Sequence, residues 1–251
     1  MTRKNWTREE LLLALNLYCK LPFSKFSSTT PEIKNLARII DRSPGAVAMK
    51  LSNFASLDDS LSQTGLENAS KLDKAMWDEF TGDWDRVALE SEEIFATQTG
   101  DQDIEESDDD FANIIQVTEA KQTVKVRLGQ RFFRSTVLNN YNIRCCICQL
   151  PMESLLIASH IIPWKVDSEN RLNPHNGMSL CAIHDKAFDR GFLTLDEKYQ
   201  VLLGTDLTHL FEYEAVERFF LHYQHKPIHK PEKFAPKQDF LEYHRNHIFV
   251  E

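Results

Sequence analysis

Cysteine and histidine residues in the C-terminal half of the chain are spaced like the ligands of a metal ion. Cys145 and Cys148 form a C-x2-C pair, and Cys181 and His184 form a C-x2-H pair after a segment of about thirty residues. Two such pairs are typical of a tetrahedral zinc site, because thiolate and imidazole suit this borderline-soft ion. The sequence therefore predicts a structural zinc with three cysteine ligands and one histidine ligand.

Cys146 leaves a second arrangement open, because Cys146 and Cys148 form a C-x-C pair. A spacer of two residues lets one turn present both sulfurs to a single ion, which favours Cys145 over Cys146. The competing interpretation is a set of buried cysteines without a metal. The start of the chain, MTRKNWTREE, has no apolar signal core, so we expect a cytoplasmic protein with thiols or metal ligands in place of disulfides.

Two aspartates follow the second pair directly. If the segment AIHDKAFDR is helical, Asp185 and Asp189 project from one face, one turn apart. Two hard oxygen ligands suit Mg²⁺ or Mn²⁺, which takes its other ligands from water and a substrate phosphate. Lys186 and Arg190 are close enough in sequence to contact that phosphate.

Three motifs occur in order between residues 129 and 203: Q-x2-FR-x3-L-x2-Y-x2-RC, SHIIPW and NG-x2-LC-x2-H-x3-FD-x-G. Together they resemble the HNH endonuclease family, in the branch associated with restriction endonucleases. The resemblance implies a ββα-metal fold and metal-dependent hydrolysis of DNA, in restriction or another defence role. The closing segment FLEYHRNHIF is also similar to the tail of such proteins.

The resemblance also implies roles for two residues between the cysteine pairs. His160 would be the general base on the first strand of a β-hairpin, and an imidazole that titrates near neutrality suits this work. Asn176 would brace the hairpin and fix the orientation of the histidine through amide hydrogen bonds.

The sequence departs from the commonest HNH pattern at two positions. The residue before the base is usually an Asp or His that ligates the metal, and here it is Ser159; the final His of the family name falls at Asp185. We interpret Asp185 as the substituted ligand and Asp189 as compensation for Ser159. In the alternative, His184 serves the catalytic metal and zinc keeps three protein ligands; a full set of soft and borderline ligands for zinc favours the first interpretation.

The first 88 residues are predicted to be helical. Thr7 and Glu10 form a capping-box pattern at the start of a helix over Glu9 to Tyr18, and Pro31 suits the first turn of a second helix. The string LARIIDRSPGAVAMKLSNF resembles a helix-turn-helix, and WTREEL resembles the start of Myb-like domains.

A helix-turn-helix would place the helix that begins near Ser43 in the major groove of DNA, with Ser43, Lys50 and Asn53 exposed for contact. A small helical bundle without a DNA role is the alternative, because this region is not net basic. Major-groove reading by a helix is a B-form device, so it points to double-stranded DNA, although the hydrolytic chemistry alone does not exclude RNA.

The net charge of −9 is concentrated in one segment. Lys+Arg and Asp+Glu number 12 and 12 in residues 1–89 and 17 and 15 in residues 121–251, whereas residues 90–120 hold 11 acidic side chains and no basic ones. We expect three parts: a helical domain (1–88), an acidic linker (89–122) and an HNH nuclease domain (123–251). The linker is either solvated or a strap that occupies the DNA groove.

The fold expected from these features is α+β: a small helical domain joined to a ββα-metal domain with a structural zinc. The leading functional hypothesis is a DNA endonuclease that uses Mg²⁺ or Mn²⁺, and double-strand cleavage by a single-site enzyme would favour a homodimer. A regulator that binds DNA through a catalytically silent, zinc-stabilised HNH fold is the alternative. No segment approaches the ~20 apolar residues of a membrane span, so no membrane partner is expected.

Overall fold

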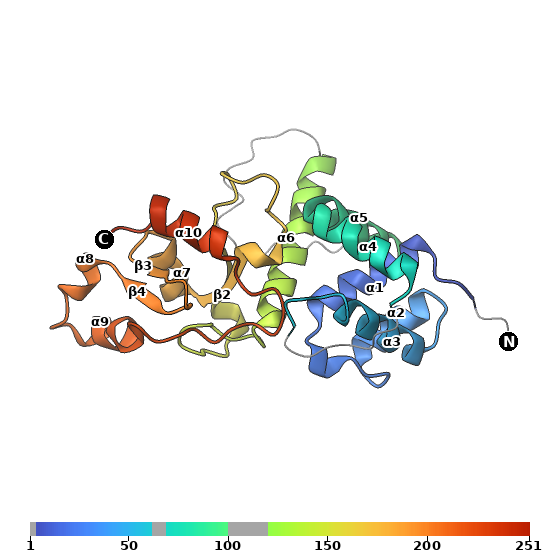
Figure 1. The fold of residues 1–251 in the computed structure, drawn as a ribbon, viewed down its shortest axis with the longest axis horizontal. Coiled ribbons are helices and arrows are strands. Elements are labelled where there is room, and N and C mark those ends of the chain that lie inside the picture. Colours follow the sequence, from blue (N-terminus) through green and yellow to red (C-terminus); the bar gives the residue numbers. More distant parts are fainter. Residues whose placement is uncertain (1–3, 62–68, 100–119) are drawn as a thin grey trace. The chain divides into compact units, whose positions relative to one another are not determined.

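The computed structural model describes residues 4–61, 69–99 and 120–251. They belong to two compact units (Figure 1). The N-terminal unit comprises Met1–Asp59 and Gln63–Phe132, and the C-terminal unit comprises Ser60–Ser62 and Phe133–Glu251. Helices dominate both, and the sheets seen in the described residues lie in the C-terminal unit. The predicted α+β class is confirmed.

The N-terminal unit is built around its first helix. The capping box at the start of this helix forms as predicted: Thr7 Oγ1 accepts from Glu10 N at 3.2 Å, and Glu10 Oε2 accepts from Thr7 N at 2.9 Å. Residues 11–15 are all at most 2% exposed, so the helix is covered on every side in this stretch. The helices are α1 (Arg8–Lys20), α2 (Pro31–Ile39), α3 (Pro44–Ala55), α4 (Lys71–Gly82) and α5 (Trp84–Thr99), with a 3-10 turn, η1, at Phe23–Lys25.

Helix α5 overturns one expectation. No regular structure was expected after Gly82 and a linker was expected from residue 89, yet the helix runs to Thr99. Its inner face holds Val87, Ala88 and Glu92, and the buried Glu92 accepts a hydrogen bond from Asn16 Nδ2 at 2.7 Å. A buried carboxylate with partners is tolerated in a helix, so the acidic composition did not prevent packing. The rest of the linker, residues 100–119, and the strap hypothesis that rests on it lie outside the described residues.

The C-terminal unit is a succession of short elements after one long helix, α6 (Ala120–Asn140), whose second part belongs to this unit. A hairpin of β1 and β2 leads directly into α7, and a second hairpin of β3 and β4 follows. The further elements are η3 (Glu153–Leu155), β1 (Leu156–His160), η4 (Pro174–Asn176), β2 (Gly177–Cys181), α7 (Ala182–Asp189), β3 (Leu193–Leu195), β4 (Val201–Leu203), α8 (Thr205–Thr208), α9 (Glu214–Phe219), η5 (Leu221–Tyr223) and α10 (Gln238–His247).

The first hairpin has a close contact with α6. Strands β1 and β2 are antiparallel, with His160 opposite Gly177. A Cβ atom at Gly177 would come within 2.5 Å of Val137 and 2.8 Å of Phe133, so only glycine lets the hairpin lie this close to α6. The hairpin is therefore seated on α6 at the level of His160.

Helix α10 fastens the end of α7. The His244 ring stacks on Phe188 with centroids 3.7 Å apart. Its Nε2–H donates to Phe188 O at 3.1 Å, so its Nδ1 accepts from Thr194 Oγ1 at 2.9 Å. The burial of His244 lowers its pKa to about 4, which keeps the ring neutral in this arrangement.

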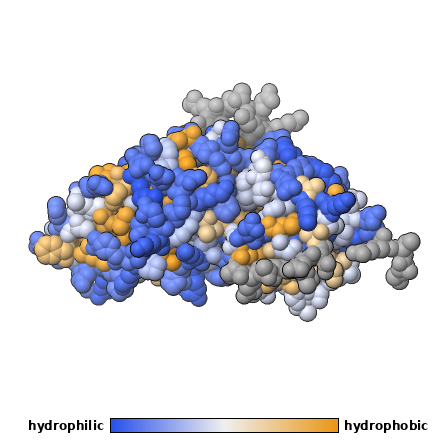
Figure 2. Space-filling view, in the orientation of Figure 1, coloured by the Kyte–Doolittle hydropathy of each residue, from blue (hydrophilic) through white to orange (hydrophobic). Residues whose placement is uncertain are grey.

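The visible surface is mostly hydrophilic, with separate hydrophobic patches (Figure 2). Phe211 and Tyr213, just before α9, are 68% and 61% exposed. No helix in the described part of the chain combines the length and apolar character needed to cross a bilayer.

Candidate metal centre and active site

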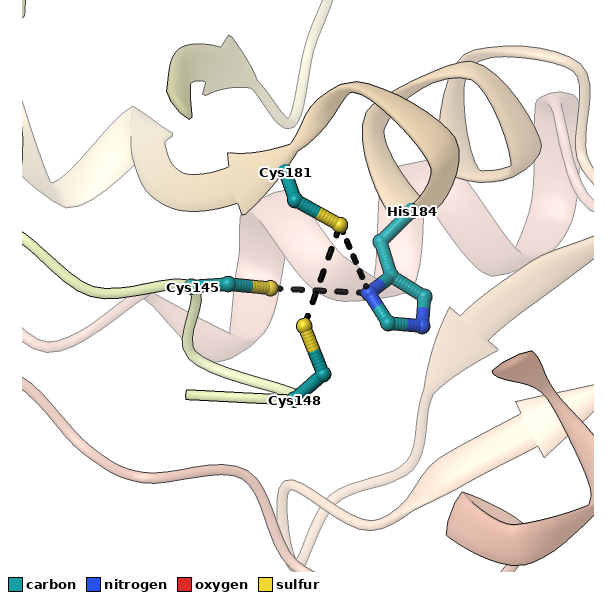
Figure 3. A group of neighbouring side chains, drawn as sticks. All are labelled: Cys145, Cys148, Cys181 and His184. Carbon is teal, nitrogen blue, oxygen red and sulfur yellow. Dashed lines mark hydrogen bonds between the residues drawn. The ribbon is translucent and has the colours of Figure 1, made fainter. Parts of the chain in front are cut away.

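The four predicted zinc ligands converge in the C-terminal unit. The three sulfurs of Cys145, Cys148 and Cys181 and the Nδ1 atom of His184 all lie within 4.8 Å of one another. In Figure 3 the four side chains point toward a common centre. The Nδ1 atom lies 3.5 Å from the sulfur of Cys145 and 3.2 Å from that of Cys181, and the Cys148 and Cys181 sulfurs are 3.8 Å apart.

These spacings fit a tetrahedral zinc ion. Zn–S bonds of ~2.3 Å and Zn–N bonds of ~2.0 Å at tetrahedral angles place two sulfurs roughly 3.8 Å apart and a sulfur and a nitrogen roughly 3.5 Å apart. The observed distances lie close to both values. The donor set, three thiols and an imidazole, is also one that zinc prefers. The distance of 3.2 Å between Cys181 Sγ and His184 Nδ1 is shorter, so the cluster could hold zinc after a small adjustment of these side chains.

The backbone brings the ligands together through two tight turns. Cys145 and Cys148 lie in a turn after α6 in which Cys145 O accepts from Gln149 N at 2.9 Å, and Gln149 takes a positive φ of 60°. Cys181 ends β2 and is the N-cap of α7, so His184 lies in the first turn of that helix. His184 Nε2 is 2.7 Å from Phe219 O and donates to it, which turns Nδ1 toward the sulfurs.

Without a metal ion, the ligands of the cluster shift one another's pKa values in opposite directions. Contacts with Cys148 and Cys181 raise the pKa of Cys145, whereas contacts with the other two thiols lower the pKa of Cys181. Although burial opposes it, hydrogen bonds to Cys145 and Cys181 raise the pKa of His184 to about 10. A divalent cation would allow all three sulfurs to be thiolates with a neutral imidazole.

Cys146 lies outside the cluster, and Cys145 is the residue whose sulfur lies with the other three ligand atoms. Its backbone N–H donates to Ser179 O at 2.8 Å and its carbonyl accepts from His229 N at 2.8 Å. Burial raises the pKa of the Cys146 thiol well above its ordinary value, which is the behaviour of a packing cysteine.

His160 ends β1 in a tightly defined position. Its ring stacks on Phe133 with centroids 3.9 Å apart and planes at 8°, and Trp164 contacts it edge-on at 5.5 Å. Its Nε2 lies 2.8 Å from Arg171 O and donates to it, so Nδ1 carries the free lone pair. Burial lowers the pKa of His160 to about 4, although the bond to Arg171 opposes this shift.

Asn176 joins the start of β2 to the loop that follows β1. Its Oδ1 accepts from Ile162 N at 2.8 Å, and its Nδ2 donates to Ile162 O at 3.2 Å and Asn170 O at 3.1 Å. The backbone of Asn176 also accepts from Ile161 N at 2.9 Å. The amide therefore fastens the backbone directly after His160.

The two aspartates lie on α7 in different environments. Asp185 is 9% exposed, whereas Asp189, at the last position of the helix, is exposed, as are Lys186 and Arg190. Although Asp189 as a residue is exposed, partial loss of hydration at its carboxylate raises its pKa, and the charges of Lys186 and Arg190 oppose this shift. Within residues 4–61, 69–99 and 120–251, the zinc-type cluster is the one group of three or more Cys, His, Asp or Glu side chains with converging ligand atoms. The two aspartates would thus supply only some of the ligands of a metal ion.

A comparison with protein families decides what these elements are. Residues 145–196 match the family model described as HNH endonuclease. The C-terminal unit carries an HNH endonuclease domain. The match begins at the first zinc-type cysteine and ends just after β3, so it includes His160, Asn176 and α7. No curated protein matches the chain significantly.

Three residues that hold His160 in place were not assigned a role from the sequence. They are Phe133 on α6, which stacks on His160, and Trp164 and Arg171 in the loop between β1 and β2. Arg171 also binds Trp164 O through Nε at 3.0 Å and places its guanidinium 5.3 Å from the Trp164 ring centre. The FFR and SHIIPW strings contained two of them, but a stacking partner cannot be read from spacing.

The residues expected to read DNA in the N-terminal unit differ in exposure. Ser43 is exposed and caps α3, with its side chain accepting from Ala46 N at 3.2 Å. The expected exposure of Lys50 is wrong: it is 6% exposed and its Nζ lies 2.5 Å from Asp73 Oδ1. Asn53 is half-buried and donates to Asp73 Oδ2 at 3.2 Å. A buried cation paired in this way cannot reach DNA without breaking the pair.

Proposed function

We propose that this protein is a metal-dependent endonuclease that hydrolyses phosphodiester bonds in DNA. The HNH family is generally made up of nucleases, and the match covers the whole β1–β2–α7 segment. The observation that carries the proposal is the state of His160: its Nε2–H is held by Arg171 O, and its Nδ1 is left as a proton acceptor.

His160 would act as the general base. The lowered pKa of about 4 keeps the ring neutral at pH 7, so Nδ1 can accept a proton from the attacking water, but it also makes His160 a weaker base than the near-neutral imidazole expected from the sequence. The stack on Phe133 and the bond to Arg171 fix the direction in which that lone pair points. Asn176 supports the same position by fastening the backbone that follows. Orientation of this kind removes much of the entropic cost of the reaction.

Asp185 and Asp189 would hold the catalytic Mg²⁺ or Mn²⁺. Two carboxylates fit such an ion in part, because it keeps several water and phosphate ligands when bound by proteins. When bound, it would neutralise charge that develops on the phosphate. Lys186 and Arg190 are exposed on and just after α7 and are suited to contact the neighbouring phosphates. The Cys145, Cys148, Cys181 and His184 cluster would hold a structural zinc.

The wider role of the protein follows from the resemblance of its motifs to restriction endonucleases. We propose a restriction or defence nuclease of the cytoplasm, in which the helix-turn-helix-like α2–α3 region recognises sequence or base modification in double-stranded DNA. Ser43 is an exposed candidate contact, whereas Lys50 and Asn53 would first have to leave Asp73. Cleavage of both strands would be carried out by a homodimer.

A second function is favoured by one observation. Ser159 occupies the position before the base, its Oγ is buried, and no hydrogen-bond partner for it exists among the described residues. A hydroxyl in this environment is a poor substitute for a carboxylate or imidazole ligand. The alternative is therefore a DNA-binding regulator with a silent, zinc-stabilised HNH domain.

A plasmid assay separates the two functions. Wild type, His160→Gln and a control, His247→Gln, are incubated with supercoiled plasmid and Mg²⁺, Mn²⁺ or EDTA. His160→Gln keeps an amide donor for Arg171 O but removes the base, so nicking should fall ~100- to 10,000-fold while the control stays near wild type. Zinc content is measured for all three proteins, and so is DNA affinity in buffer without Mg²⁺, Mn²⁺ or chelator. An intact plasmid with every metal, together with preserved DNA binding, would replace the enzyme with the regulator.

A further inference from the structure

A second concave site lies in the C-terminal unit, and it shares no residue with the candidate nuclease site. The cavity has a volume of about 270 Å³ and is open to solvent. It is bounded by the turn after α6 on one side and by the segment before α10 on the other. The residues that line it are Tyr141, Asn142, Arg144, Gln149, His229 and Lys230.

The charge of this cavity is positive and uncompensated. Its lining contains Arg144 and Lys230 and no carboxylate. The guanidinium of Arg144 makes one long contact, 3.4 Å to Gln149 O, and Lys230 Nζ lies 4.3 Å from the Tyr199 ring centre. Neither cation is paired with an acidic side chain in the described part of the chain.

The neutral members of the lining are also hydrogen-bond donors. Tyr141 is 6% exposed, and its hydroxyl has no hydrogen-bond partner among the residues that the structure describes. Its burial raises the pKa of the phenol, so the hydroxyl stays protonated and able to donate. Asn142 adds an amide, and His229 adds an exposed imidazole. Because this hydroxyl is itself buried, a ligand in the open cavity would meet the exposed side chains of Asn142 and His229 first.

The walls of the cavity are held by the zinc-type turn. Arg144 directly precedes Cys145, and Gln149 Nε2 donates to Cys145 O at 2.8 Å. From the other side, His229 N donates to Cys146 O at 2.8 Å. The donors are therefore carried by backbone segments that hydrogen bonds join to the zinc-type turn, so a ligand would have to order the side chains but not the backbone.

We propose that this cavity binds the phosphate group of a nucleotide. An arginine fork, an ammonium group and neutral N–H donors suit a tetrahedral oxyanion, and the absence of carboxylates from the lining argues against a metal cation. The phosphate could belong to the DNA backbone, in which case the proposal rests on the proposed function and adds a second anchor for the substrate. It could also belong to a free nucleotide, which would not require DNA.

The test compares two double variants with the same change of charge. The first is Arg144→Gln with Lys230→Gln; the second, as control, is Lys198→Gln with Arg218→Gln, two exposed cations of the same unit outside the cavity. Affinity for a fluorescent DNA duplex is measured by anisotropy at several salt concentrations, in buffer without Mg²⁺, Mn²⁺ or chelator. The cavity variant should bind about 10-fold more weakly, and its slope of log K against log salt should fall by about 1, whereas the control should change little.

Binding of dAMP and of inorganic phosphate is measured by calorimetry in the same proteins. If wild type does not bind DNA, the proposed function fails but the cavity proposal stands, provided that dAMP binds wild type and is lost in the cavity variant alone. The proposal is overturned if both double variants lose DNA and dAMP equally, or if neither ligand is affected by the cavity variant. Equal zinc content and thermal unfolding midpoints verify that both variants are folded.

Discussion

The HNH domain contains two groups of potential metal ligands that differ in how completely the protein assembles them. At the zinc-type centre, four ligand atoms come from two turns and converge within 4.8 Å. At the candidate nuclease site, Asp185 and Asp189 lie on α7, Ser159 offers a hydroxyl where an acidic or imidazole ligand is usual, and His160 Nε2 is used by Arg171 O. One centre is closed and the other is open.

This difference follows from what each ion would do. A structural ion must bind before any substrate arrives, so the protein supplies all its ligands and gains folding free energy. A catalytic Mg²⁺ or Mn²⁺ needs free positions for water and phosphate, so a partial shell is expected. Loss of the first ion should therefore affect the fold, and loss of the second should affect the rate alone.

The largest expected effect is on the closed centre. Cys148→Ser should abolish stoichiometric zinc and unfold most of the C-terminal unit, because a structural zinc contributes on the order of 10 kcal/mol to folding. Zinc content by mass spectrometry and near-UV circular dichroism measure the two outcomes. A soluble, folded Cys148→Ser protein without zinc would contradict the role assigned to this centre.

The matched control is Cys146→Ser, two residues away. Cys146 is fully buried but lies outside the ligand cluster. Its replacement should leave one zinc per chain and cost only ~1–3 kcal/mol, the usual effect of a buried hydroxyl with imperfect hydrogen bonding. Equal loss of zinc in both variants would mean that ligation is shared between Cys145 and Cys146.

Substitutions at the open centre should change the rate of DNA nicking and the metal concentration that it requires, and should not change folding. Asp185→Asn is expected to lower Mg²⁺-dependent nicking on the order of 100-fold and to raise the metal concentration for half-maximal activity, because a charged oxygen ligand is lost. Asp189→Asn should act in the same direction but less, since this carboxylate is exposed at the helix end. Both variants should keep the wild-type zinc content. A rate that is unchanged in both would exclude α7 as the source of the catalytic metal ligands.

The parts of the site that the sequence predicted are those set by local spacing. The C-x2-C and C-x2-H pairs each lie in one turn, so their ligands could be identified from residue numbers alone. The segment with Asp185 and Asp189 is helical, as its spacing required, and the strand that ends at His160 forms as the resemblance implied. The ring of Phe133 and the carbonyl of Arg171 were not assigned, because their roles arise from contacts between distant segments.

The errors have the same origin. Lys50 was expected on an exposed face, but Asp73, 23 residues further along the chain, draws it into the core of the N-terminal unit. Helix α5 was missed because an acidic composition usually indicates a solvated chain, whereas Lys20 and Asn16 compensate the buried Glu92. In both cases the compensating partner comes from another helix, and a single sequence does not show which helices meet.

The two buried histidines behind these centres should differ in their response to acid. His184 is surrounded by thiols, whereas His244 is a neutral staple between α10 and α7 whose pKa is lowered to about 4 by burial. Between the unfolded value of ~6.5 and a pH of about 4, the unfolded chain binds the His244 proton and the folded chain does not. The contribution of neutral His244 to the free energy of unfolding should thus be complete above pH 6.5. It should decrease by about 3 kcal/mol as the pH falls to 4.

This smallest effect can be isolated with His244→Phe, which keeps the stack on Phe188 and removes the titration. At pH 7 the variant should be ~1–3 kcal/mol less stable, because Phe188 O and Thr194 Oγ1 lose their partner. Urea unfolding at pH 7, 6 and 5 in excess zinc should show this gap narrowing as the pH falls, since only wild type loses the contribution of a neutral His244. Protonation of the zinc ligands affects both proteins and cancels in the difference. A gap that stays constant from pH 7 to 5 would show that His244 does not control the acid stability of the HNH domain.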